Sequence, residues 1–201
     1  ITAVSQTWYI FMDAAKDGTA TPGLGGYMHG HAWRLPLMRR DVVGPLQLPI
    51  AVLEYIAIAV SLMMFIPRIP ALAIDVVSNE GQMGHVHRVV LGSDSISSVG
   101  ALLSLRSKSS LMQFVTLFLK DMPEANTPNF VLELAHVYGA GNVFADAESR
   151  GYDALISALA RQLRVNYTPL QPPQRAHELL KHVREANERL ETVPRKRSLN
   201  P

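Results

Sequence analysis

The stretch HVYGAGNVFADAESR, residues 136–150, decides how the fold is interpreted. The residues that lead into it, 129–137, alternate apolar and polar side chains, as in a strand with one buried face. A glycine-rich loop that ends at Asn142 follows, and the rest of the stretch fits a helix. The sequence here therefore predicts a strand that ends at His136 and a helix that carries Asp146.

Earlier segments of the chain predict four more strands. Residues 7–14 are apolar and rich in β-formers, and residues 89–93 form a short apolar run of the kind found in buried strands. Residues 24–29 and 31–37 are separated only by Gly30, which indicates a tight turn between antiparallel strands. The first three strands should therefore form an antiparallel meander.

Helical segments separate the later strands. The first of these segments is almost entirely apolar, and residues 109–120 place apolar side chains on one face at helical spacing. The predicted helices are residues 48–66, 96–105, 109–120, 143–150 and 153–163. The resulting order, β-β-β-α-β-α-α-β-α, predicts an α/β (α+β) fold with one five-stranded mixed sheet covered by helices.

One segment is apolar enough to raise the question of a membrane span. Residues 47–66 approach the length that a span requires. However, Glu54 lies inside the segment, Pro49 and Pro67 flank it, and no second span accompanies it. We therefore expect a buried helix and no contact with a membrane.

The C-terminal part differs from the rest in composition. Residues 166–173 hold three prolines and predict a linker between a domain at 1–165 and an appendage at 174–201 that leads to a following domain. The appendage should begin with an amphipathic helix over residues 174–192 and end in a basic tail. The expected apolar face of that helix comprises Ala176, Leu179, Leu180, Val183 and Leu190.

Charge and cysteine content limit the kind of protein this can be. Residues 161–201 carry 9 Lys or Arg against 4 Asp or Glu, whereas residues 1–160 carry 10 against 13. A polyanion would therefore be contacted first at the basic C-terminal end, unless those charges only solvate a helix face. The absence of cysteine excludes disulfides and thiolate metal sites, and it suits an intracellular location, cytoplasm or nucleus.

Three acidic residues lie inside or at the end of apolar runs. They are Asp13, Glu54 and Asp94, and no Lys or Arg is adjacent to any of them in sequence. Each could be a helix cap or an edge residue, and Asp94 in particular could cap the helix that follows it. As a set, buried acids that converge require a cation. Oxygen ligands favour two Mg²⁺ or Mn²⁺ ions, the arrangement that hydrolyses phosphodiesters.

Residues 136–150 strongly resemble the C-terminal motif of retroelement RNase H domains, in which a His ends a strand and Ala-Asp-Ala and Ser-Arg follow a glycine loop. The other matches occur in the family's order: Asp13 after the first strand, Gly25 and Gly26 opening the second, Glu54 on the first helix and Asp94 after the fourth strand. The resemblance covers residues 5–160 and is greatest to eukaryotic retroelements that carry a tyrosine recombinase. It implies the RNase H-like fold, with Asp13, Glu54, Asp94 and Asp146 as metal ligands.

The same resemblance implies a function and partners. The chain would cut the RNA strand of an RNA–DNA hybrid, next to a reverse transcriptase domain upstream in one polyprotein. His136 would assist proton transfer or product release, and Ser95, Lys108, Asn142 and Arg150 would contact nucleic acid. Two alternatives remain open: an inactive module that binds or tethers nucleic acid, and a transposase or integrase nuclease that acts on DNA.

Overall fold

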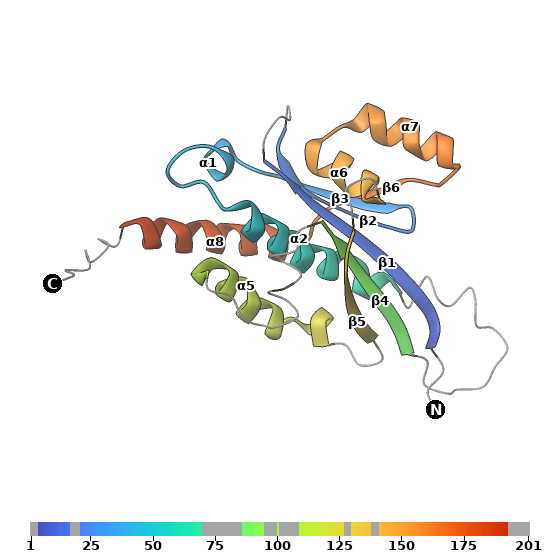
Figure 1. The fold of residues 1–201 in the computed structure, drawn as a ribbon, viewed down its shortest axis with the longest axis horizontal. Coiled ribbons are helices and arrows are strands. Elements are labelled where there is room, and N and C mark those ends of the chain that lie inside the picture. Colours follow the sequence, from blue (N-terminus) through green and yellow to red (C-terminus); the bar gives the residue numbers. More distant parts are fainter. Residues whose placement is uncertain are drawn as a thin grey trace.

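Strand β1 (Val4–Ala15) lies at the centre of the sheet in the computed structural model of the chain (Figure 1). The structure describes residues 4–16, 21–69, 86–94, 100, 109–126, 130–137 and 141–192. Alternate residues of β1, among them Trp8, Ile10 and Met12, are buried against the main core. Tyr9 points to the other face and is exposed, so β1 has the period-two pattern of a strand between two unlike faces.

The strand order is β5-β4-β1-β2-β3-β6. Strand β2 (Gly23–Met28) pairs antiparallel with β1 and with β3 (His31–Pro36), while β4 (Val86–Ser93) pairs parallel with β1 and with β5 (Phe130–His136). Three antiparallel strands followed by two parallel ones, in the order 3-2-1-4-5, confirm the predicted mixed sheet of the RNase H-like fold. A turn at His29 and Gly30, both with positive φ, connects β2 to β3.

Helix α2 (Ile50–Phe65) crosses one face of this sheet. It is apolar all round because β1 and β2 contact one side of it and two further helices contact the other. Among the described residues, the helical run from Ile50 to Arg68 is long and apolar enough to cross a membrane, but 83% of its most apolar window is buried inside the protein. A core helix therefore lies within the predicted segment 48–66, over Ile50–Phe65.

The remaining helices form two layers (Figure 1). Helices α5 (Ser110–Lys120) and α8 (Gln174–Thr192) pack on α2. Helix α6 (Val143–Arg150) packs on the opposite face, directly against β1 and β2, and α7 (Asp153–Leu163) packs on α6. The short helices are α1 (Arg39–Val42), η1 (Ile66–Arg68) and η3 (Pro123–Asn126).

The structure differs from the prediction at the C-terminal end. The sheet has six strands among the described residues, because β6 (Thr168–Leu170), inside the expected linker 166–173, pairs parallel with β3. On α8, Ala176, Leu179, Leu180 and Val183 are buried as predicted, but Leu190 is exposed. Asn187 takes its place on the buried face, where its side-chain amide donates to the Leu46 carbonyl at 2.8 Å.

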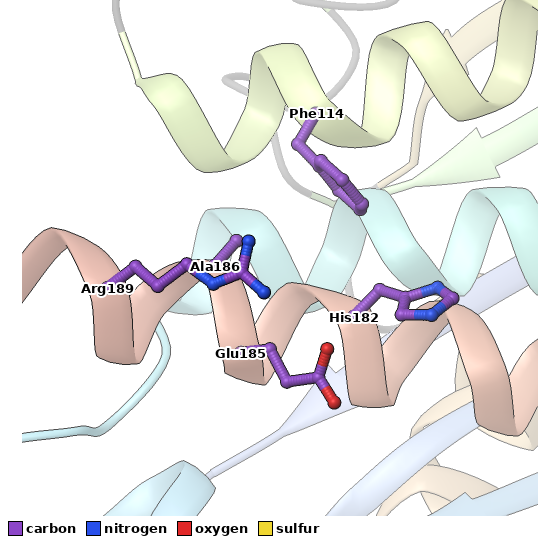
Figure 2. A pocket seen from close by; sticks show the side chains of 5 residues that line it. All are labelled: Phe114, His182, Glu185, Ala186 and Arg189. Carbon is purple, nitrogen blue, oxygen red and sulfur yellow. The ribbon is translucent and has the colours of Figure 1, made fainter.

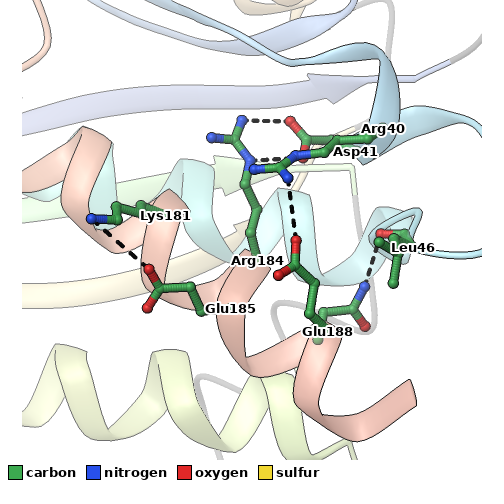
Figure 3. A network of polar contacts seen from close by, with 8 residues as sticks. Arg40, Asp41, Leu46, Lys181, Arg184, Glu185 and Glu188 are labelled. Carbon is green, nitrogen blue, oxygen red and sulfur yellow. Dashed lines mark hydrogen bonds and ion pairs between the residues drawn. The ribbon is translucent and has the colours of Figure 1, made fainter. Parts of the chain in front are cut away.

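Helix α8 is fastened to the segment that leads into α2 (Figure 3). The Arg184 guanidinium donates to both carboxylate oxygens of Asp41, with its Nε at 2.7 Å and its Nη2 at 2.5 Å. The same carboxylate accepts the Met38 N–H at 2.8 Å and so caps the first turn of α1. Residues 174–192 are thus part of the same packed core as the sheet.

The start of one strand also differs from the prediction, and one predicted helix is not described. Strand β4 begins at Val86, three residues before the predicted strand 89–93, because β1 begins at Val4 and offers it a partner. The predicted helix 96–105 lies outside the described residues, apart from position 100.

Candidate metal centre

Three of the predicted metal ligands come together at one edge of the sheet. Asp13 is near the end of β1, Asp94 directly follows β4, and Glu54 lies in the second turn of α2. Because β1 and β4 are parallel neighbours, their carboxyl ends reach the same edge. Each of the three residues offers one carboxylate oxygen, and these oxygens all lie within 4.8 Å of one another.

Glu54 and Asp13 are both buried, whereas Asp94 is exposed. Oε1 of Glu54 accepts the Ala14 N–H at 3.0 Å, which anchors the side chain to the end of β1. Burial raises the pKa of Glu54 well above its usual value, and the neighbouring carboxylates of Asp13 and Asp94 raise it further. Oε2 of Glu54 is buried without a hydrogen-bond partner in the part of the chain that the structure describes.

Asp13 lies on β1 and is buried beneath α6. Burial raises the pKa of Asp13 from 3.8 to about 6, while a hydrogen bond from the Ser149 hydroxyl lowers it and the charges of Asp94 and Asp146 raise it. Two buried carboxyl groups with raised pKa values, side by side, indicate a site that lacks positive charge.

The residues present fit a hard divalent cation. All donors in the cluster are oxygens, and the unpaired Oε2 of Glu54 is the kind of buried atom that a cation would satisfy. Mg²⁺ and Mn²⁺ prefer such carboxylate sets, whereas zinc prefers nitrogen and sulfur. The cluster is therefore a candidate Mg²⁺ or Mn²⁺ site held by Asp13, Glu54 and Asp94.

The raised pKa of Asp13 predicts how stability depends on pH when a chelator removes metal. The folded chain holds the Asp13 proton more tightly than the unfolded chain, so the free energy of unfolding falls as pH rises from about 4 to about 6. The expected loss is about 3 kcal/mol, because one pKa unit corresponds to about 1.4 kcal/mol. Urea unfolding in EDTA across this range measures it.

Asp13→Asn is the reference for this measurement, because it cannot ionise at that position. The difference between the unaltered chain and Asp13→Asn should grow with pH, and Mg²⁺ should reduce it, since metal binds the deprotonated carboxylate. A difference that stays constant from about pH 4 to 6 would contradict the raised pKa.

Asp146, the fourth predicted ligand, is close to the cluster but is not one of its three members. It lies on α6, and its Oδ1 accepts the Nε–H of Arg150, one helical turn later, at 2.7 Å. The charge of Asp146 nevertheless helps to raise the pKa of Asp13, so the two carboxylates are near neighbours. The structure thus groups three of the four predicted acids, and the fourth is paired with a guanidinium.

His136 and Asn142 frame the site from the β5–α6 segment. The exposed His136 ends β5 beside Ser93, and its Nε2 is 3.1 Å from the main-chain oxygen of Asp94, to which it donates. Asn142 was predicted to contact nucleic acid, but its side chain is buried and donates to the Met12 carbonyl at 2.9 Å. In this arrangement Asn142 fastens the start of α6 to β1.

The other predicted contacts to nucleic acid stay predictions. Ser95 and Lys108 lie outside the described residues. Arg150 is partly exposed at the edge of the cluster, where its charge also lowers the pKa of Asp13.

Ser149 is a part of the site that sequence reasoning did not single out. It was visible only as a letter of the 136–150 motif, and serines are common in helices. In the structure its hydroxyl contacts the Asp13 carboxylate. The approach of α6 that allows this contact depends on Gly25, since a Cβ there would lie 2.5 Å from the Ser149 nitrogen.

A separate hollow lies between α5 and α8 (Figure 2). Its volume is about 410 Å³, and its lining residues are Phe114, His182, Glu185, Ala186 and Arg189. None of the predicted ligands lines it, and its single carboxylate could not hold a divalent ion by itself. It is therefore not the candidate metal centre.

No protein-family model and no curated protein matches the chain. The solved structure of LC11-RNase H1, isolated from compost by a metagenomic approach, matches with 17% sequence identity and a TM-score of 0.44, over 76% of this chain and 98% of that one. The fold assignment rests on the strand order and directions given above.

Proposed function

We propose that the chain is an RNase H-type nuclease that uses two metal ions to hydrolyse the RNA strand of RNA–DNA hybrids. The observation that supports this most is the grouping of Asp13, Glu54 and Asp94, which come from three separate elements and have oxygens within 4.8 Å of one another. Asp13 and Glu54 are buried with raised pKa values beside the exposed Asp94, a costly arrangement that a catalytic role explains better than a structural one.

Each side chain has a distinct task in this proposal. Bound Mg²⁺ or Mn²⁺ supplies the activation of water and the neutralisation of charge that phosphodiester hydrolysis needs. Asp13, Glu54 and Asp94 hold metal, and Asp13 and Glu54 are buried away from bulk water while Asp94 is exposed. Asp146 provides the fourth carboxylate once Arg150 releases it, and the freed guanidinium then binds a phosphate oxygen.

His136 is placed to move a proton at the rim of this site. It is exposed, and its ring is held beside Asp94 by the contact to the Asp94 main-chain oxygen. An imidazole suits proton transfer near neutral pH, which supports the proposed role in proton transfer or product release.

The wider setting is part of the same proposal. We expect a retroelement polyprotein with a reverse transcriptase domain upstream, located in the cytoplasm or nucleus. This rests on the resemblance of residues 136–150 to retroelement RNase H domains. Contacts from Ser95, Lys108, Arg150 and the basic residues of 161–201 would hold the hybrid, whose RNA strand is distinguished through its 2′-OH and groove shape.

The decisive experiment is cleavage of an end-labelled RNA–DNA hybrid by the purified chain in Mg²⁺ or Mn²⁺. We expect metal-dependent cutting of the RNA strand alone, with no cutting of duplex DNA or duplex RNA. Asp94→Asn is the control, because it keeps the shape of the side chain and removes its charge. It should leave the fold unchanged and eliminate cleavage.

Other outcomes would replace the proposal. Hybrid binding without cleavage by a folded chain would favour a module that tethers nucleic acid. Cutting of duplex DNA would favour a nuclease of the transposase or integrase kind.

A further inference from the structure

Ser149 occupies a position between two of the proposed metal ligands. It lies in the last turn of α6, and its relative exposure is 0%. Its hydroxyl donates to Oδ2 of Asp13 and also lies 2.9 Å from the main-chain oxygen of Asp146. One side chain therefore contacts an acid on the sheet and the turn of helix that carries another.

The hydroxyl has a single proton, so it cannot donate to both oxygens at once. A metal ligand must be deprotonated, and an ionised Asp13 is the stronger acceptor. In the metal-binding state the proton therefore goes to Asp13. That bond restricts rotation of the Asp13 carboxylate and determines which way its oxygens face the cluster.

The backbone around Ser149 leaves it little freedom to move. Gly25 is the cross-strand partner of Asp13, and α6 rests directly on this glycine. A Cβ on Gly25 would come within 2.5 Å of the Ser149 nitrogen and 2.7 Å of the Ala145 oxygen. Tyr27 and Phe144 stack beside this contact with ring centroids 4.4 Å apart, which holds α6 on β2.

We propose that Ser149 is a positioning residue of the metal centre. It orients the carboxylate of Asp13, and by joining β1 to α6 it sets the distance between Asp13 and Asp146. This inference rests on the proposed function, since it concerns the same ions. Ser149 itself contacts neither metal nor substrate in this account. Groups that orient metal ligands are commonly worth about 10- to 100-fold in metal affinity.

The test is metal binding, which does not depend on nuclease activity. Binding of Mn²⁺ to the full chain is measured by calorimetry and by the loss of the free-ion electron paramagnetic resonance signal. Ser149→Ala should weaken the binding by about 10- to 100-fold. Ser149→Thr, which keeps the hydroxyl, should bind more tightly than Ser149→Ala.

Ser61→Ala is a matched control. Ser61 also has a relative exposure of 0%, and its hydroxyl accepts a hydrogen bond from Trp33 at 3.2 Å, but it touches none of the acids. This variant should lose stability and bind Mn²⁺ like the unaltered chain. Urea unfolding of all variants shows that the compared proteins are folded.

The Mn²⁺ affinities of these variants decide whether Ser149 positions Asp13. Wild-type affinity in folded Ser149→Ala, or an equal loss in Ser61→Ala, would overturn the positioning role while the proposed function stands. Absence of Mn²⁺ binding by the unaltered chain would overturn the proposed function, and the inference with it.

Discussion

Glu54→Gln is expected to lower cleavage of the RNA strand by about a thousandfold or more, which corresponds to about 4 kcal/mol of lost transition-state stabilisation. The same change should raise the free energy of unfolding in EDTA at neutral pH. Gln can still accept the Ala14 N–H through its amide oxygen, so the anchor to β1 is kept. What is lost is the buried negative charge, which Asp13 and Asp94 repel in the metal-free chain.

Glu148→Gln provides a matched control. Glu148 and Glu54 are equally buried, at 4% exposure, and burial raises the pKa of both. Glu148, however, accepts a hydrogen bond from the Tyr167 hydroxyl and lies outside the acidic cluster. Its substitution should leave cleavage within a few-fold of the unaltered chain, a change of less than about 1.4 kcal/mol in the activation free energy.

The two readouts separate ligand loss from misfolding. Cleavage is measured on the labelled hybrid, and stability by urea unfolding in EDTA. If Glu54→Gln were as active as Glu148→Gln, Glu54 would not be a metal ligand. If it were less stable than the unaltered chain without metal, repulsion among the three acids would not be the dominant effect.

Arg184→Met is expected to have the largest effect on stability, a loss of about 3 to 5 kcal/mol. Asp41, the partner of Arg184, is only 1% exposed, so removal of the guanidinium leaves a buried carboxylate without a counter-charge. The hydrogen bond from Met38 N–H cannot compensate for this alone. Equilibrium unfolding in urea measures the difference.

Two further variants show whether the loss of stability in Arg184→Met arises because the ion pair is buried. Adding Asp41→Asn to Arg184→Met should recover part of the lost stability, because the charge is gone. Arg40→Ala breaks an ion pair with Glu188 whose side chains are 54% and 41% exposed, and it should cost no more than about 1 kcal/mol. Equal losses in Arg184→Met and Arg40→Ala would show that Asp41 is not an effectively buried charge.

The sheet could be predicted because its strands carry their own signals. The β-rich apolar run of β1, the alternation in β5, the apolar run of β4 and the turn at Gly30 are local properties of the sequence, and tertiary packing reinforced them. Strand β6 has no such signal. Its three residues include Pro169, and they form a strand only because β3 presents a free edge.

Three acids of the candidate site could be predicted from the sequence, but two of its side-chain contacts could not. Asp13, Glu54 and Asp94 stand out because they interrupt apolar runs, which is costly without a compensating ion. The pairing of Asp146 with Arg150 depends on side-chain rotamers that sequence spacing only permits. The contact of Ser149 with Asp13 joins residues 136 positions apart, and nothing local to either residue indicates it.

The position of α8 has a consequence for how the chain acquires its structure during synthesis. Helix α2 leaves the ribosome well before α8, whose Leu179, Leu180 and Val183 complete the core around it. At ordinary translation speeds the interval is on the order of ten seconds. Throughout that time the most apolar segment of the chain lacks one of its permanent neighbours, so the nascent protein should depend on chaperones until residue 192 has been added.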